Sequence, residues 1–212
     1  QPQIAGEGRR IACDFSFPEI EPETSQPIAA AWESSPRMKE EEFTRALTLG
    51  LFDYLRKSGS RGFVVSLSGG ADSSSVACLV ALMVEMAAAE LGPDEFNARL
   101  RHIPALKEAA TDRERVHALL SCAYQASRNS SPDTRRSAVS LAEALGAEMA
   151  CWEIDELVAD YTAKVEGFLG RKLTWDRDDL ALQNIQARVR GPGVWMLANV
   201  KGALLLATSN RS

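Results

Sequence analysis

The residues best suited to do chemistry lie in one short segment, residues 68–73 (SGGADS). Two adjacent glycines let the backbone approach a polyphosphate closely, and the hydroxyls of Ser68 and Ser73 can donate hydrogen bonds to it. An apolar run at residues 62–67 precedes the segment, and a long apolar stretch at residues 76–91 follows it. This order predicts a strand, a glycine turn and a helix whose N-terminal amides face a bound anion.

Asp72 makes this prediction more specific. A carboxylate beside a phosphate site repels the ligand unless a divalent cation lies between them, and Mg²⁺ is the usual cation in such sites. We therefore expect Asp72 to be a magnesium ligand. The alternative is a structural glycine turn in which Asp72 or Ser73 caps the following helix.

Other catalytic patterns are missing from the sequence. It contains neither the Walker phosphate loop nor G-x-G-x-x-G, and its two histidines do not form a zinc motif. No C-x-x-C pair occurs, so we interpret the cysteines as buried structural thiols. These cysteines are Cys13, Cys78, Cys122 and Cys151.

Apolar periodicity and breakers predict the elements that position the loop. Strands are predicted at residues 62–67, 116–125, 147–154 and 203–207, and helices at 38–57, 72–91, 137–145, 155–169, 178–190 and 194–200. Residues 94–115 are predicted as helix or loop. Strands that alternate with helices predict an α/β fold, a Rossmann-like parallel sheet with helices on both faces. We expect a kink near Arg190, with Pro192 at the start of a new helix.

Composition narrows the functional classes. The chain has 212 residues, 24 Lys and Arg against 29 Asp and Glu, and a net charge of -5, which argues against a nucleic-acid partner. Glu85 interrupts the longest apolar stretch, so we expect no membrane association, and we predict a cytoplasmic protein.

At these residues the sequence resembles a known family. SGGADS is similar to the SGGxDS loop of the N-type ATP pyrophosphatases, which GMP, asparagine and argininosuccinate synthetases and tRNA-modifying enzymes share. Three further segments resemble NAD synthetase specifically: residues 128–131 (RNSS), 182–190 (LQNIQARVR) and 206–212 (LATSNRS). The resemblance spans about residues 40–212, and it implies an adenine nucleotide alpha hydrolase-like fold.

The resemblance implies ATP-dependent amidation of deamido-NAD. The nicotinate carboxylate attacks the α-phosphorus of ATP, pyrophosphate leaves, and ammonia displaces AMP from the acyl adenylate. ATP is then a co-substrate and Mg²⁺ the cofactor, and no protein nucleophile is needed. The ammonia would come from solution or from glutamine through an amidase domain.

The resemblance also assigns residues to these roles. Asp72 matches a magnesium ligand. Asn184 and Arg188 match residues that contact deamido-NAD, and their spacing places them on one helical face, with Leu182, Ile185 and Val189 as the buried stripe. The residues that match the site for ATP and pyrophosphate are Ser66, Leu67, Ser68, Gly69, Gly70, Ala71, Asp72, Ser73 and Thr208.

The two ends of the chain lead to expectations about its context. Residues 1–36 are rich in proline and resemble the linker that follows the amidase domain of glutamine-using NAD synthetases. Residues 37–212 then form the ATP-pyrophosphatase domain. The family places a magnesium-binding glutamate shortly after the position of Thr208, so we expect the chain to stop before that residue. The family is usually at least dimeric, which predicts a homo-oligomer.

Two other functions remain open. A different ATP pyrophosphatase, such as a tRNA-modifying or amidotransferase member, should carry a basic face or a cysteine pair. An ATP-binding module without catalysis would be consistent with the missing glutamate, but the retention of Asp72, Asn184 and Arg188 argues against it.

Overall fold

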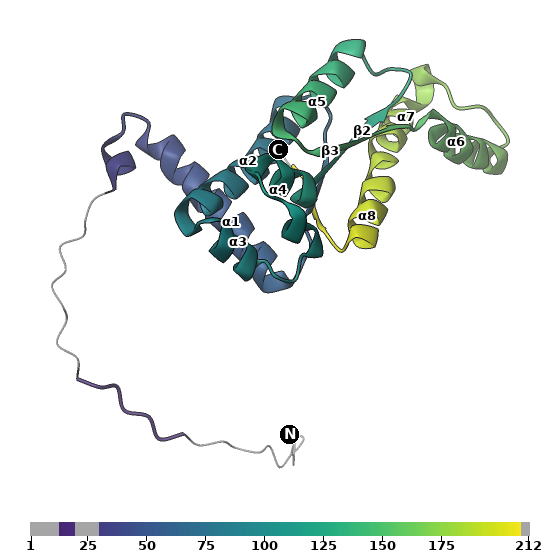
Figure 1. Ribbon diagram of the computed structural model, residues 1–212. Coiled ribbons are helices and arrows are strands. Elements are labelled where there is room, and N and C mark those ends of the chain that lie inside the picture. The colour runs from purple at the N-terminus through teal and green to yellow at the C-terminus, as the bar shows by residue number, and fades with distance from the viewer. Residues whose placement is uncertain (1–12, 20–29, 209–212) are drawn as a thin grey trace, which may run out of the picture. The chain divides into compact units, whose positions relative to one another are not determined.

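The computed structural model describes residues 13–19 and 30–208, which belong to two units, Gln1–Pro36 and Arg37–Ser212. The described part of the first unit contains one short 3-10 helix, η1 (Ala31–Ser34). The second unit contains the other described helices and strands (Figure 1). The division lies after Pro36. That residues 1–36 connect to an amidase domain stays a prediction.

Four parallel strands form one sheet in the order β3-β2-β1-β4. Val65 of the central strand lies opposite Cys122 on one side and Leu206 on the other. Parallel neighbours cannot be joined by a tight turn, so helices connect them, and this confirms the predicted α/β fold. The strands are β1 (Phe63–Ser66), β2 (Leu120–Ala126), β3 (Glu148–Glu153) and β4 (Leu204–Leu206).

The helices alternate with these strands along the chain. They are α1 (Met38–Ser58), α2 (Ala71–Leu91), α3 (Pro93–Arg99), the 3-10 helix η2 (Pro104–Glu108), α4 (Asp112–Leu119), α5 (Pro132–Leu145), α6 (Asp155–Leu169), α7 (Trp175–Arg188) and α8 (Arg190–Lys201).

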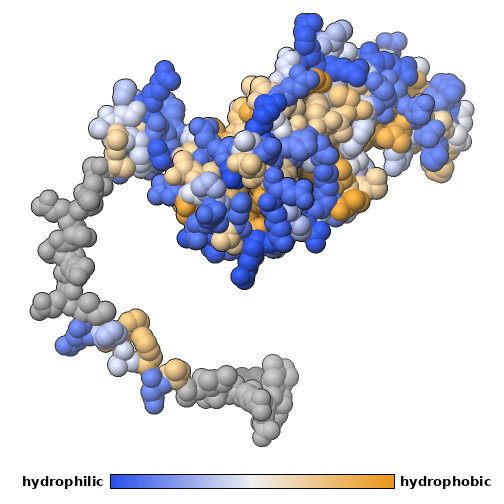
Figure 2. Space-filling view, in the orientation of Figure 1, coloured by the Kyte–Doolittle hydropathy of each residue, from blue (hydrophilic) through white to orange (hydrophobic). Residues whose placement is uncertain are grey.

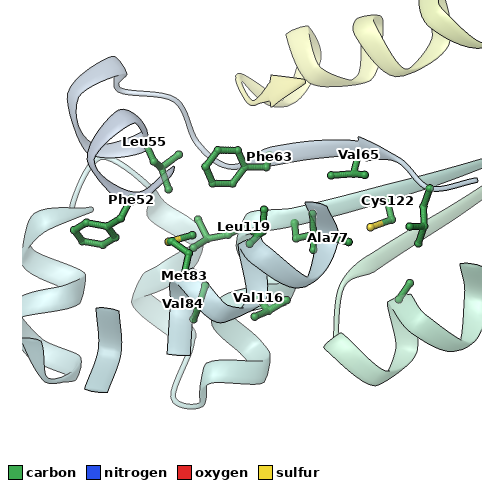
Figure 3. Close-up of a cluster of buried hydrophobic side chains, with 14 of the residues drawn as sticks. Phe52, Leu55, Phe63, Val65, Ala77, Met83, Val84, Val116, Leu119 and Cys122 are labelled. Atoms are coloured by element: carbon green, nitrogen blue, oxygen red, sulfur yellow. The ribbon is translucent and has the colours of Figure 1, made fainter. Parts of the chain in front are cut away.

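Helices cover both faces of the sheet, as the sequence predicted. Successive side chains of a strand point to opposite faces. Phe63 and Val65 therefore join the larger core, which they form with α1, α2, α4 and α5 (Figure 3). Val64 points to the other face, where Val194 and Ala198 of α8 cover it. Figure 1 shows α8 on the opposite side of the sheet from α2 and α5.

Helix α2 is the central helix of the larger core. Among the described helices, only α2 is long and apolar enough to span a membrane. Its contacts give it a different role, because it packs against the sheet and against α1, α3, α4 and α5. Ala77, Val80 and Val84 are completely buried in this packing. Its apolar composition is therefore explained by the core.

The predicted strand at residues 116–125 begins too early. Residues 116–119 form the last turn of α4, and β2 begins at Leu120. The reason lies upstream, where Thr111 accepts a hydrogen bond from the Glu114 amide and the Glu114 carboxylate accepts one from the Thr111 amide. The backbone amides of Thr111 and Ala110 both donate to the Glu114 carboxylate, which lowers the pKa of Glu114. This capping box starts a helix whose apolar residues continue directly into the strand.

The prediction of buried cysteines is confirmed only for Cys122. Cys13 and Cys151 are exposed, and Cys78 is half-buried. Cys151 lies on β3, an edge strand that no second neighbour covers in the described sheet. Figure 2 shows the visible surface as mostly hydrophilic with separate hydrophobic side chains, as is usual for a folded protein.

The contrast between Cys122 and Cys151 can be measured. Burial raises the pKa of the Cys122 thiol to about 12. Because the thiolate is the reactive form, at pH 8 only about one molecule in ten thousand carries it at Cys122. We expect a maleimide to label Cys151 at least about 100-fold faster than Cys122 in the folded protein, by mass spectrometry of the labelled peptides. The two rates should converge in urea. Equal rates in the folded protein would contradict the burial of Cys122.

Candidate active site

The candidate site lies at the carboxyl edge of the sheet. After β1 the chain forms β2 and β3 on one side of β1 in the sheet, and it then crosses over to form β4 on the other side. The connections therefore diverge between β1 and β4. In open α/β sheets ligands bind outside the carboxyl ends of the strands at such a point. The glycine loop, residues 66–73, begins at the last residue of β1, and Thr208 lies two residues beyond β4. The fold thus brings these predicted site residues to one place, where Thr208 is exposed.

Hydroxyl groups hold the glycine loop in shape. The Ser73 hydroxyl accepts a hydrogen bond from the Ser68 amide at 3.1 Å and donates one to the Gly70 carbonyl at 3.2 Å. The Ser68 hydroxyl lies 3.0 Å from that of Ser73 and accepts from the Gly70 amide at 3.3 Å. Leu67 is buried, and its amide donates to the Ala123 carbonyl of β2 at 2.9 Å. The loop is therefore anchored to the sheet and held by its own hydroxyls.

Gly69 fits where no other residue does. Its φ of +81° lies in the left-handed region, and a Cβ added there would lie 2.3 Å from the Thr134 carbonyl oxygen of α5. Thr134 is itself fixed, since its hydroxyl lies 2.8 Å from that of Tyr124 on β2. The loop therefore packs directly against the backbone of α5.

Asp72 lies in the first turn of α2 with an exposed side chain. The N-cap of this helix is Gly70, so neither Asp72 nor Ser73 caps it as the structural alternative proposed. Among residues 13–19 and 30–208, no three acidic, cysteine or histidine side chains gather as a metal-binding group. A single carboxylate still suits Mg²⁺, which proteins bind with one or two carboxylates plus substrate phosphates. Asp72 fits that role.

Asn184 and Arg188 lie on α7, and both side chains are exposed. Val189 is buried, but Leu182 and Ile185 are only half-buried, so the predicted buried stripe is confirmed for Val189 alone. The predicted break also occurs, because α7 ends at Arg188 and α8 begins at Arg190. Pro192 lies in the first turn of α8, where its missing N–H costs nothing.

Helix α7 is linked to the end of β2 rather than directly to the glycine loop. The Asn129 side-chain amide donates to the Gln186 side chain at 3.1 Å. The Arg190 guanidinium donates to the Gln186 carbonyl at 2.6 Å. Residues 128–131, which the sequence linked to the family, thus contact the helix that carries Asn184 and Arg188.

A cleft of about 480 Å³ opens beside this contact, between α6, α7 and the loop after β2. Its charges are paired, since Arg128 lies 3.3 Å from Asp155 and Lys172 lies 2.7 Å from Glu166. Next to it Arg171 binds both carboxylate oxygens of Asp178 at 2.7 Å, which lowers the pKa of Asp178 far below its ordinary value. The lining residues are Arg128, Asn129, Asp155, Val158, Ala159, Thr162, Ala163, Glu166, Lys172, Trp175, Leu182 and Gln186.

Sequence reasoning missed Gln125 and Arg190 as members of the site. Gln125 is buried, and its side-chain amide donates to the Ser66 hydroxyl at 3.2 Å and to the Arg190 carbonyl at 2.8 Å. The available signal was a large amide near the end of a mostly apolar strand. Such a buried amide needs partners, and those partners are revealed only by the fold.

Comparison with known proteins identifies the family. The model of the NAD synthase family matches residues 43–212. The chain belongs to the NAD synthase family. The matched part includes the glycine loop, α7 and Thr208, so every residue that the resemblance assigned to a role lies within it.

Individual relatives agree with this assignment. The glutamine-dependent NAD(+) synthetase of Drosophila melanogaster is 35% identical over 220 residues, which cover 98% of this chain and 27% of that protein. The crystal structure of such an enzyme from Cytophaga hutchinsonii superposes with a TM-score of 0.76 at 48% identity and covers 82% of this chain and 31% of its own. The ADP complex of the Acinetobacter baumannii enzyme covers 88% and 27%, and its TM-score of 0.57 at 21% identity shows a shared fold.

The chain spans only about a quarter to a third of these relatives' length. What the match establishes for this NAD synthase family member is therefore the domain and its fold. The roles of individual residues at the carboxyl edge stay predictions.

The packing of Gly69 leads to a stability prediction. Gly69→Ala should lower the free energy of unfolding by about 2 kcal/mol or more, because it adds strain at positive φ and a clash with backbone. Gly50→Ala is the matched control: Gly50 lies inside α1 with nothing within 4 Å of an added Cβ, and the change should stabilise by about 0.5–1 kcal/mol. Urea unfolding measures both. Equal midpoints for Gly69→Ala and the unaltered protein would contradict the close approach.

Proposed function

We propose that this chain is the ATP-dependent amidation domain that converts deamido-NAD to NAD, with release of AMP and pyrophosphate. The observation that carries the proposal is the glycine loop, residues 66–73, at the divergence of β1 and β4 in a chain of the NAD synthase family. The loop suits a polyphosphate and α7 carries a polar pair for the second substrate. ATP binding is also in keeping with the ADP complex of the Acinetobacter baumannii relative.

In this proposal the protein binds and orients ATP. The backbone of Gly69 and Gly70 allows close approach, and the N-terminus of α2 directs free amides and a positive dipole end at the phosphates. Asp72 would hold Mg²⁺, which, when bound, neutralises charge on the departing pyrophosphate. Thr208 would contact the nucleotide from the end of β4.

The chemistry then needs no protein nucleophile. A carboxylate oxygen of deamido-NAD forms a bond to the α-phosphorus of ATP as the bond to pyrophosphate breaks, which gives an acyl adenylate. Ammonia attacks the acyl carbon, the carbon–oxygen bond to AMP breaks, and a proton passes to solvent. Positioning and electrostatic stabilisation can supply most of the rate enhancement of such reactions.

Asn184 and Arg188 would hold deamido-NAD. Both are exposed on α7 and four residues apart, so an amide and a guanidinium face solvent from the same side of the helix. A guanidinium suits the carboxylate and phosphate groups of a dinucleotide because it binds planar oxygen pairs.

The wider context of the domain is part of the proposal. The named relatives are glutamine-dependent, so we propose that ammonia comes from glutamine hydrolysed in an amidase domain, with residues 1–36 as the connection. A cytoplasmic location, a homo-oligomer and the absence of nucleic-acid or membrane partners stay predictions.

A tRNA-modifying role is disfavoured by the family match. An ATP-binding module without turnover is distinguished by the experiment below.

The test uses the whole protein that contains this chain, with ATP, Mg²⁺, deamido-NAD and ammonium chloride. AMP and pyrophosphate should form only when deamido-NAD is present. Asp72→Asn should lower the rate by about 100-fold, because the metal loses its carboxylate ligand. Higher Mg²⁺ should restore part of the loss.

Asp94→Asn is the matched control, since Asp94 is also an exposed acid in the first turn of a helix, α3. It should leave the rate unchanged. ATP cleavage that proceeds equally without deamido-NAD would overturn the substrate assignment. ATP binding without any AMP formation would instead identify a non-catalytic module.

A further inference from the structure

We propose that Gln125 is a positioning residue that makes the Ser66 hydroxyl a hydrogen-bond donor toward ATP, and that it ties the glycine loop to the α7–α8 junction. This inference rests on the proposed function, because it assumes that the glycine loop binds ATP. It adds a residue outside the loop, on β2, to the machinery that prepares the loop.

The geometry fixes the orientation of the Gln125 amide. The side chain is buried, with 6% of its surface exposed. One atom of its amide lies 2.8 Å from the backbone carbonyl oxygen of Arg190. A carbonyl oxygen can only accept, so this atom is the NH₂ nitrogen, because the opposite orientation would place two acceptors in contact.

The orientation of the Gln125 amide determines whether the Ser66 hydroxyl donates to it or accepts from it. The same nitrogen lies 3.2 Å from the Ser66 hydroxyl oxygen, and it carries just two hydrogens, one for Arg190 and one for Ser66. Because that nitrogen has no acceptor capacity, the Ser66 oxygen must accept. The hydrogen of the Ser66 hydroxyl is thereby left for another acceptor.

No described residue provides that acceptor, since the hydrogen bond from Gln125 is the only one that the Ser66 side chain makes in this part of the chain. Ser66 is the last residue of β1, three positions before Gly69, and its side chain is half-buried. A hydroxyl donor at the start of a phosphate loop suits an oxygen of the nucleotide.

Gln125 and Arg190 are joined by two hydrogen bonds, and each residue is the donor in one of them. The Arg190 carbonyl accepts from the Gln125 side chain, and the Arg190 guanidinium donates to the Gln125 carbonyl at 3.4 Å and to the Gln186 carbonyl at 2.6 Å. Arg190 begins α8, and only Val189 separates it from α7, the helix of Asn184 and Arg188. One buried amide therefore connects the ATP loop to the helix proposed for the second substrate.

A double-mutant cycle tests this role. In the full chain, Gln125→Met removes both donated hydrogen bonds with little change in length, and Ser66→Ala removes the hydroxyl. Each should weaken Mg·ATP binding by about 10-fold, as measured by calorimetry, because Ser66→Ala removes the charge-assisted donor and Gln125→Met removes the hydrogen bond that orients this donor. The double variant should be no weaker than either single variant, because both act through one hydrogen bond.

Gln183→Met is the control, since Gln183 is an exposed glutamine on α7, and it should leave ATP affinity unchanged. Independent, multiplied losses in the double variant would overturn the proposal, because Gln125 would then not act through Ser66. Unchanged affinity in Gln125→Met would overturn it as well. If the unaltered chain does not bind ATP, the proposed function fails first, which is a distinguishable result.

A second measurement covers the case in which Gln125→Met does not fold. In the unaltered chain, the Gln125 side-chain amide hydrogens should exchange with solvent at least about 100-fold more slowly than those of Gln183. The reason is that the two Gln125 hydrogens are buried and each is donated in a hydrogen bond. Their NMR signals should shift when Mg·ATP is added. Exchange as fast as that of Gln183, or no shift at ATP saturation, would contradict the proposal.

Discussion

The pairing of β1 with both β2 and β4 is the constraint on which the rest of the structure depends. β1 has only four residues, yet its side chains enter both cores, Val65 against α2 and Val64 against α8. A strand buried on both faces and bonded on both edges cannot move without disrupting two layers of helices. The loop that follows it therefore starts from a fixed point, and the α2 N-terminus is presented at the sheet edge.

The loop is held in shape by hydroxyl and backbone groups rather than by acids and bases. Ser68 and Ser73 satisfy each other and the loop backbone, and Gly69 brings the loop onto α5. These contacts hold the loop amides in place before any ligand arrives, which is how preorganised dipoles stabilise developing charge. The chain as a whole is acidic, so attraction for an anion must come from these local dipoles and from a cation rather than from net charge.

The polar contacts outside the loop each link an element near the site to the end of β2. Gln125 reaches Ser66 and Arg190, Asn129 reaches Gln186, and Arg128 pairs with Asp155 at the start of α6. Strand β2 lies beside β1 in the sheet, so its end can contact both the loop and α7. The two proposed substrate elements thus share one scaffold.

Much of this could be predicted from the sequence, because local patterns determine it. The glycine loop, α2 and the break near Pro192 depend on spacing, glycine freedom and proline chemistry within a few residues, and each of these elements occurs as expected. The predicted strand start at residue 116 was wrong, because apolar residues suit a helix and a strand equally well. The cap at Thr111, which decides for a helix, lies upstream. Cys151 was wrongly taken as buried because an apolar strand at the sheet edge still exposes side chains.

By itself, then, the sequence determined a glycine loop, its acid at Asp72 and the alternation that makes a parallel sheet. Only the tertiary structure decided which side chains meet there. Gln125 and Ser66 are 59 positions apart, and Gln125 and Arg190 are 65 apart. Hydrogen bonds over such separations exist because strand order and helix packing bring the ends of β1, β2 and α7 together, and a one-dimensional pattern contains no distance between them.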